Sequence, residues 1–125
     1  MGVGMADPLQ CADQAISNFV RYNVGSPPWP NWSNLKPGDT QNGWNASPGE
    51  WRGQGRAIIG DFEACMGITI VHNNSHLNSL RMRTLTTFRD YLVEQAGVAI
   101  ARAELEQARA NLASARAAAS TTQIL

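Results

Sequence analysis

The sequence lacks most of the features by which enzymes and nucleic-acid-binding proteins are recognised. Ten basic and ten acidic residues cancel over 125 residues, so there is no basic excess of the kind that a general nucleic-acid binder or a polybasic membrane anchor carries. It contains no G-x-S-x-G motif, no phosphate-binding glycine loop ahead of a helix and no Cys/His pair in an activating context. We therefore expect no enzyme activity, no cofactor, no sequence-specific nucleic acid and no small-molecule substrate.

Long apolar runs and cysteines are also scarce. No apolar stretch approaches the roughly 18 residues that span a bilayer, so we expect no membrane partner. The first residues have neither the basic region nor the apolar core of a secretory signal, which favours a cytoplasmic assembly or a virion as the setting. Without an export signal, Cys11 and Cys65 are expected to be reduced and buried, and a disulfide between them is the alternative.

A repeated seven-residue unit is the most legible feature that is present. Residues 101–121 contain three such units, each beginning Ala-Arg-Ala. Together with Val98 they place Val98, Leu105, Leu112 and Ala119 at one heptad position and Ala at another. This pattern is typical of a coiled-coil seam flanked by arginines at the e position and Glu104 at the g position. The alternative is an exposed alanine-rich helix with solvated arginines. The predicted interface on this helix is Val98, Ala101, Arg102, Leu105, Ala108, Arg109, Leu112, Ala115 and Arg116.

The repeat Ala-Arg-Ala-x-Leu also resembles the helical hairpins of bacterial efflux adaptor proteins. The resemblance is confined to the repeated units and follows from coiled-coil composition. It implies a coiled-coil helix and carries no function.

Helical spacing of apolar residues predicts an all-α fold. Asp7 and Pro8 begin a short helix that runs to Tyr22, and a second apolar stripe begins at Arg56. The β-branched run 68–71 fits either a strand or a continuation of this middle helix, and we favour a helix through Val71. After a turn at residues 72–75, one long helix is predicted from about His76 to about Ala119. These elements divide into a helical domain, 1–97, and a heptad extension with its tail, 98–125.

Residues 23–55 predict a long ordered loop. They hold five of the six prolines, six of the eleven glycines and all four tryptophans, and four indoles bury too much surface to be left free. The rings either clamp the loop to the chain's own helices or to a neighbouring subunit, or form an exposed stacking platform for a glycan or peptide. The residues concerned are Trp29, Trp32, Trp44 and Trp51.

A metal site is a further alternative. If the middle helix continued without a break, Asp61, Cys65, His72 and His76 would share one face, with the oxygen, sulfur and nitrogen atoms that metals take as ligands. Gly67 and the Asn-Asn-Ser turn interrupt that register. The simpler interpretation is a buried free cysteine with two polar histidines.

The sequence thus favours a structural subunit of a multi-protein particle, such as a phage or virus virion. The expected partners are further copies of the chain or neighbouring structural subunits, which meet along the carboxyl-terminal helix. A binding module that uses the tryptophan-rich loop and a small helical metalloprotein are the alternatives.

Overall fold

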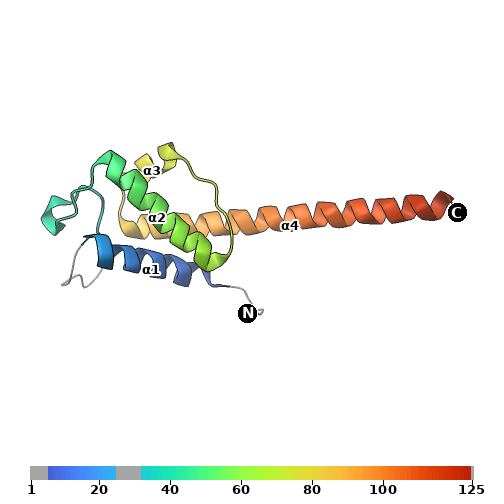
Figure 1. The fold of residues 1–125 in the computed structure, drawn as a ribbon, viewed down its shortest axis with the longest axis horizontal. Coiled ribbons are helices and arrows are strands. Elements are labelled where there is room, and N and C mark those ends of the chain that lie inside the picture. Colours follow the sequence, from blue (N-terminus) through green and yellow to red (C-terminus); the bar gives the residue numbers. More distant parts are fainter. Residues whose placement is uncertain (1–5, 25–31, 125) are drawn as a thin grey trace.

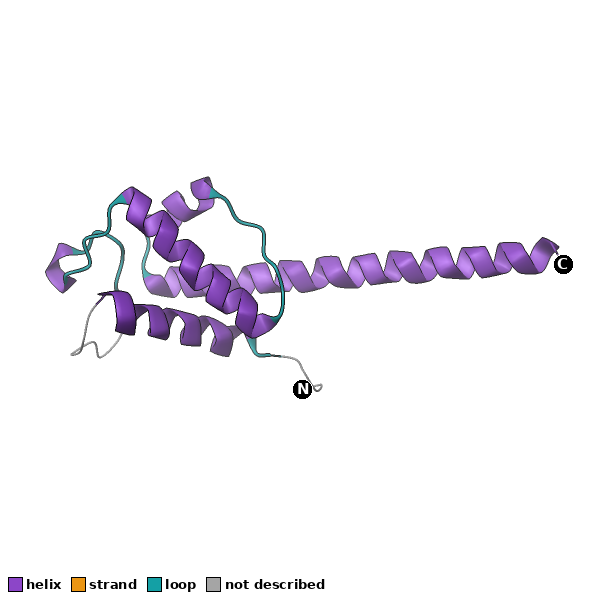
Figure 2. Cartoon of the chain, viewed as in Figure 1, coloured by secondary structure: helices purple, strands orange, loops and turns teal. Residues whose placement is uncertain are grey.

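The computed structural model describes residues 6–24 and 32–124, and every regular element in these ranges is helical (Figures 1 and 2). The predicted all-α fold class is confirmed. Two single turns, η1 and η2, accompany the four α-helices. The elements are α1 (Pro8–Phe19), η1 (Val20–Val24), η2 (Thr40–Asn42), α2 (Pro48–Met66), α3 (Asn74–Arg81) and α4 (Leu85–Ile124).

Polar side chains fix where the helices begin. The Asp7 carboxylate accepts a hydrogen bond from the backbone N–H of Leu9 at 3.1 Å, and Pro8 occupies the first turn of α1, as predicted. Ser47 and Glu50 form a capping box at the start of α2, with hydrogen bonds of 3.2 and 3.1 Å. The hydrogen bonds from Ser47, that of its side chain above all, lower the pKa of the Glu50 carboxyl group.

The middle helix differs from the prediction at both ends. It begins at Pro48 instead of Arg56, because the capping box satisfies the first N–H groups there. It ends at Met66 instead of Val71, because Gly67 adopts a left-handed conformation with φ of 70°. Residues 68–73 then run back in an irregular extended path, which the Glu63 carboxylate holds by accepting the N–H of Ile70 at 2.9 Å.

The single helix predicted from His76 to Ala119 is also wrong. The chain forms α3, turns at residues 82–84 and starts again as α4. The Asn73 side chain caps α3 by accepting the N–H of His76 at 3.0 Å. The break is fixed by tertiary contact, since the N–H of Leu85 donates to the carbonyl of Leu35 at 2.8 Å.

A row of aromatic rings runs through the core from α1 to α4. Trp51 is 1% exposed and packs edge-to-face on Phe88 of α4, with ring centroids 5.4 Å apart, and on Trp44 at 5.9 Å. Trp44 in turn meets Phe19 of α1 at 5.8 Å. The indole N–H of Trp51 donates to the carbonyl of Leu77 at 2.5 Å, so the same side chain also holds α3. Phe19 is 5% exposed, whereas Ile16 of the same helix is fully buried.

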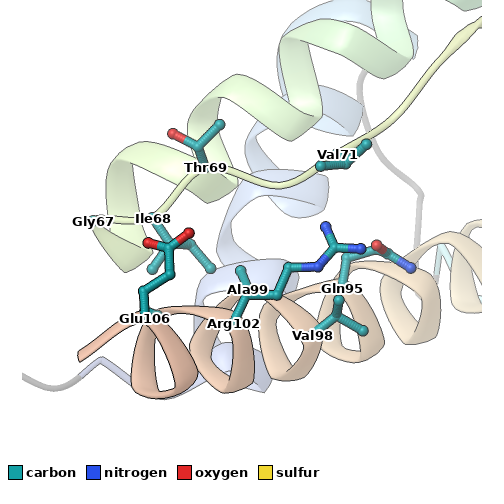
Figure 3. Close-up of a pocket in the computed structure, with 10 residues that line it drawn as sticks. Gly67, Ile68, Thr69, Val71, Gln95, Val98, Ala99, Arg102 and Glu106 are labelled. Atoms are coloured by element: carbon teal, nitrogen blue, oxygen red, sulfur yellow. The ribbon is translucent and has the colours of Figure 1, made fainter. Parts of the chain in front are cut away.

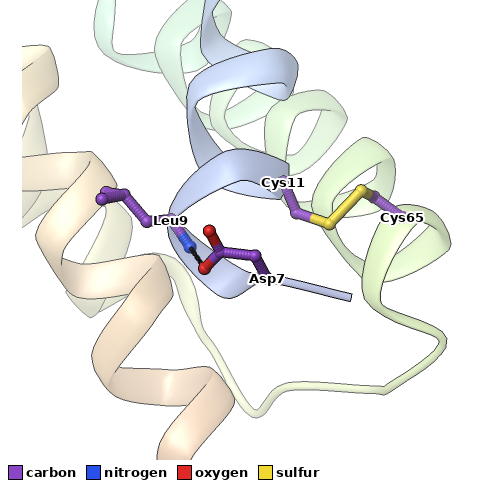
Figure 4. The surroundings of a disulfide bond; sticks show 4 residues. All are labelled: Asp7, Leu9, Cys11 and Cys65. Atoms are coloured by element: carbon purple, nitrogen blue, oxygen red, sulfur yellow. Dashed lines mark hydrogen bonds between the residues drawn. A yellow bond between two sulfur atoms is a disulfide. The ribbon is translucent and has the colours of Figure 1, made fainter. Parts of the chain in front are cut away.

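Cys11 and Cys65 form a disulfide, so the expectation that both are reduced is wrong (Figure 4). Their Cα atoms lie 5.7 Å apart, within the range that a disulfide bridges. The reason lies in the tertiary structure: the beginning of α1 packs beside the end of α2 (Figure 1), which brings together two cysteines that are 54 residues apart.

Two glycines of α2 provide a matched test of the packing between α2 and α3. A Cβ atom at Gly55 would lie 3.0 Å from the Leu77 methyl carbon, whereas one at Gly60 meets nothing within 4 Å. We expect Gly55→Ala to lower the free energy of unfolding by about 1–3 kcal/mol through overpacking. Gly60→Ala should raise it by about 0.5–1 kcal/mol because alanine is the better helix former. Urea denaturation of both variants measures these changes, and equal effects would contradict the close approach of α3.

A second prediction about stability concerns the disulfide. Replacing both cysteines, Cys11→Ala with Cys65→Ala, frees the unfolded chain from a cross-link and should lower the free energy of unfolding by about 2–4 kcal/mol. The check is chemical denaturation beside the unmodified chain, whose oxidation state is read from its intact mass. An unmodified chain that carries two free thiols after purification without reductant would contradict the disulfide.

Candidate functional site: the exposed face of helix α4

Helix α4 continues far beyond the core of the protein (Figure 1). It has 40 residues, which at 1.5 Å each span roughly 60 Å. Leu85, Phe88, Leu92 and Ala96 are buried along its first half, whereas every residue from 101 to 120 is exposed. Leu105 and Leu112 are each 51% exposed. Residues 101–120 of α4 are therefore left uncovered by the described part of the chain.

The apolar residues change sides along α4. Ala96 is the last fully buried residue of the stripe that faces the core. Leu105 follows nine residues later, and at about 100° per residue it lies roughly 180° around the helix from Ala96. Val98 and Leu112 lie on the same side as Leu105, because they are seven residues from it. The exposed apolar stripe thus faces away from the protein's own core.

We call this stripe the seam; it consists of the six residues Val98, Ala101, Leu105, Ala108, Leu112 and Ala115. Arg102, Arg109, Arg116 and Glu104 flank it, and all four are exposed. Within the described ranges, the only ion pairs are those of Arg89 with Asp13 and Asp90. The charged residues beside the seam are therefore available to another chain. The structure brings all the helix residues predicted as an interface onto one exposed side of α4.

A groove of about 360 Å³ lies where α4 leaves the core (Figure 3). One wall is the extended segment that follows α2, with Ile68, and the other is the stretch of α4 from Gln95 to Glu106. Arg102 and Glu106 reach from α4 towards that segment in Figure 3. Val98 belongs both to the groove and to the seam, so the two apolar surfaces are continuous.

Of the four tryptophans that were predicted to clamp the loop or to bind a ligand, three pack on the chain's own helices. Trp44 and Trp51 are 3% and 1% exposed. The indole of Trp44 donates to the Gln54 side chain at 3.2 Å, and that of the half-buried Trp32 donates to the Ser17 hydroxyl at 3.1 Å. Trp29 lies outside the described residues. Trp44 and Trp51 therefore offer no surface to a ligand or a neighbouring subunit in this fold.

The residues of the predicted metal site are not brought together. Cys65 is bonded to Cys11, and Gly67 ends the helix that was to align it with His72 and His76. Among residues 6–24 and 32–124, no group of three or more His, Cys, Asp or Glu side chains can hold a metal ion. Among the buried side-chain atoms of the described residues that have no hydrogen-bond partner are His72 Nδ1 and the Tyr91 hydroxyl. Burial, and then the charge of Glu94, raises the pKa of Tyr91.

None of the helices in the described ranges combines the length and the apolar character needed to cross a membrane. Helix α4 has an exposed apolar stripe at heptad spacing on one side and the core on the other. Comparison with known proteins finds no matching family model, no matching curated protein and no matching solved structure.

Proposed function

We propose that the protein is a structural subunit that assembles with further copies of itself through the seam of α4. The observation that carries this proposal is the position of the seam. Its apolar residues repeat at coiled-coil spacing, are exposed, and lie on the side of α4 that the protein's own core cannot reach.

The leucines of the seam favour this proposal over the alternative of an exposed helix with no partner. Alanine alone has the helix propensity to support an exposed helix, and arginine is nearly as good. Leu105 and Leu112 add nothing that such a helix needs, yet half of each side chain is exposed. Covering that half contributes on the order of 1 kcal/mol for each leucine. Association through so short a seam is therefore expected to be reversible, and stronger when several copies are held in one particle.

A phage or virus particle, or a comparable assembly, is the setting we propose. Disulfides persist at virion surfaces and in other oxidising environments, and the disulfide between α1 and α2 fits such a setting. The alternative of a binding module needs exposed tryptophans, but two of the four are buried. The alternative of a metalloprotein needs Cys65 as a ligand, but Cys65 is bonded to Cys11.

The proposal predicts a concentration-dependent mass. Light scattering and sedimentation equilibrium of the full chain should show oligomers at high micromolar concentration. Leu105→Gln with Leu112→Gln should return the chain to a monomer, because the glutamines remove the apolar side chains but keep good helix propensity. The matched control is Ala110→Gln with Ser114→Gln on the side of α4 opposite the seam.

The control variant should associate as the unmodified chain does. Circular dichroism of all three proteins should show equal helix content, which confirms that only the surface has changed. A full chain that remains monomeric at these concentrations, or a control that loses association equally, would contradict assembly through the seam.

A further inference from the structure

The seam also specifies how two copies are oriented. We propose that α4 pairs with α4 of a second copy in an antiparallel arrangement, with Leu105 of each chain packed on Ala108 of the other. This inference rests on the proposed function and adds the partner, the direction and the register. It follows from the alternation of large and small residues along the seam, from charge, and from the place of the protein's core.

Side-chain size favours the antiparallel direction. In a parallel pair, each seam residue meets its own copy, so layers of two leucines alternate with layers of two alanines. Two alanines bring helix axes closer than two leucines allow, since the axial distance follows the side chains at the contact. A parallel pair is thus crowded at Leu105 and Leu112 or hollow at Ala108, and either defect costs stability. In an antiparallel pair, every layer can combine one large and one small residue.

Only one antiparallel register pairs a large residue with a small one in every layer of the seam. It gives six layers, of three kinds that each occur twice by symmetry: Val98 with Ala115, Ala101 with Leu112, and Leu105 with Ala108. A shift by one heptad in one direction pairs Ala101 with Ala119 and moves Val98 beyond the seam. The opposite shift keeps only four of the six layers. The preferred register therefore uses every seam residue and leaves no alanine facing alanine.

The charges at the ends of the seam agree with this direction. Glu94 lies one heptad before Ala101, on the seam side of α4, and is exposed. In the antiparallel register it comes beside Ala119 of the second copy, one turn from that copy's Arg116, so the two can form an ion pair at each end. A parallel pair places Glu94 beside Glu94, which is repulsive. Arg102 approaches Arg109 of the second copy, and Glu106, one turn from both on its own helix, offsets that approach.

The core of each protein does not obstruct the pair. The seam lies roughly 180° around α4 from the stripe that packs on the core, so the two cores fall on the outer flanks. The carboxyl-terminal part of the second copy then reaches the base of α4, beside Val98, which is 37% exposed. This is also the mouth of the groove between α4 and the segment after α2, where Val71 is 63% exposed. The pairing thus covers the apolar residues that the single chain leaves open at both ends of the seam.

Cysteine cross-linking of the full chain distinguishes the two directions. Val98→Cys and Ala115→Cys are prepared separately with tags of different mass; because the native cysteines are bonded to each other, each variant has one free thiol. On mild oxidation, a cross-linked pair should appear when the two variants are mixed and not with Ala115→Cys alone. Positions 98 and 115 are 17 residues apart, so in the antiparallel pair two copies of position 115 lie roughly 25 Å from each other.

A matched control places the cysteine at Ala110, on the side of α4 away from the seam, and should give no cross-link with Val98→Cys. The mass of each sample is measured before oxidation, so that orientation is tested only on molecules shown to associate. Cross-linking of Ala115→Cys to itself, or dimers that give no cross-link in the mixture, would overturn the antiparallel register while assembly through the seam stands. A chain that is monomeric before oxidation would overturn both proposals.

Discussion

The burial of Trp51 is the contact on which the rest of the structure depends. Its indole touches Trp44 from the irregular loop and Phe88 of α4, and donates a hydrogen bond to Leu77 of α3. A small all-helical chain has few other means of joining elements so distant in sequence. Truncation of such a side chain in a core typically costs about 3–5 kcal/mol, a large part of the stability of a domain of this size. The capping box at Ser47 and Glu50 places Trp51 one turn inside α2 and so fixes its direction.

The direction of α4 follows from these contacts. Phe88, Leu92 and Ala96 commit one side of its first half to the core, and the rigidity of the helix carries that orientation outward for about eight more turns. Gly97 marks the point at which the apolar residues pass to the other side. Because the core packs on the side of α4 that carries Ala96, the seam at Leu105 and Leu112 on the opposite side faces solvent. The same helix therefore stabilises the fold with one face and leaves the opposite face exposed, which is the surface that we propose for assembly.

The disulfide and the segment after α2 act together at the base of the projecting helix. Cys65 ties the end of α2 to the start of α1, and Gly67 then turns the chain back along α4. The extended path that follows, held by Glu63, forms one wall of the groove beside Val98. The disulfide and this hydrogen bond therefore fix the part of the core from which α4 projects.

The sequence by itself determined the helical class, the cap at Asp7 and the seam, because these depend on the periodicity and the chemistry of neighbouring residues. The start of α2 was also readable, since Ser47 and Glu50 form the standard capping-box pattern, although the glycines and the tryptophan around them favoured a loop. Only the tertiary structure decided that Trp44 and Trp51 are core residues, that α3 and α4 are separate, and that Cys11 meets Cys65. Each of these depends on contacts between residues far apart in the chain, such as the hydrogen bond from Leu85 to Leu35, and no local pattern records them.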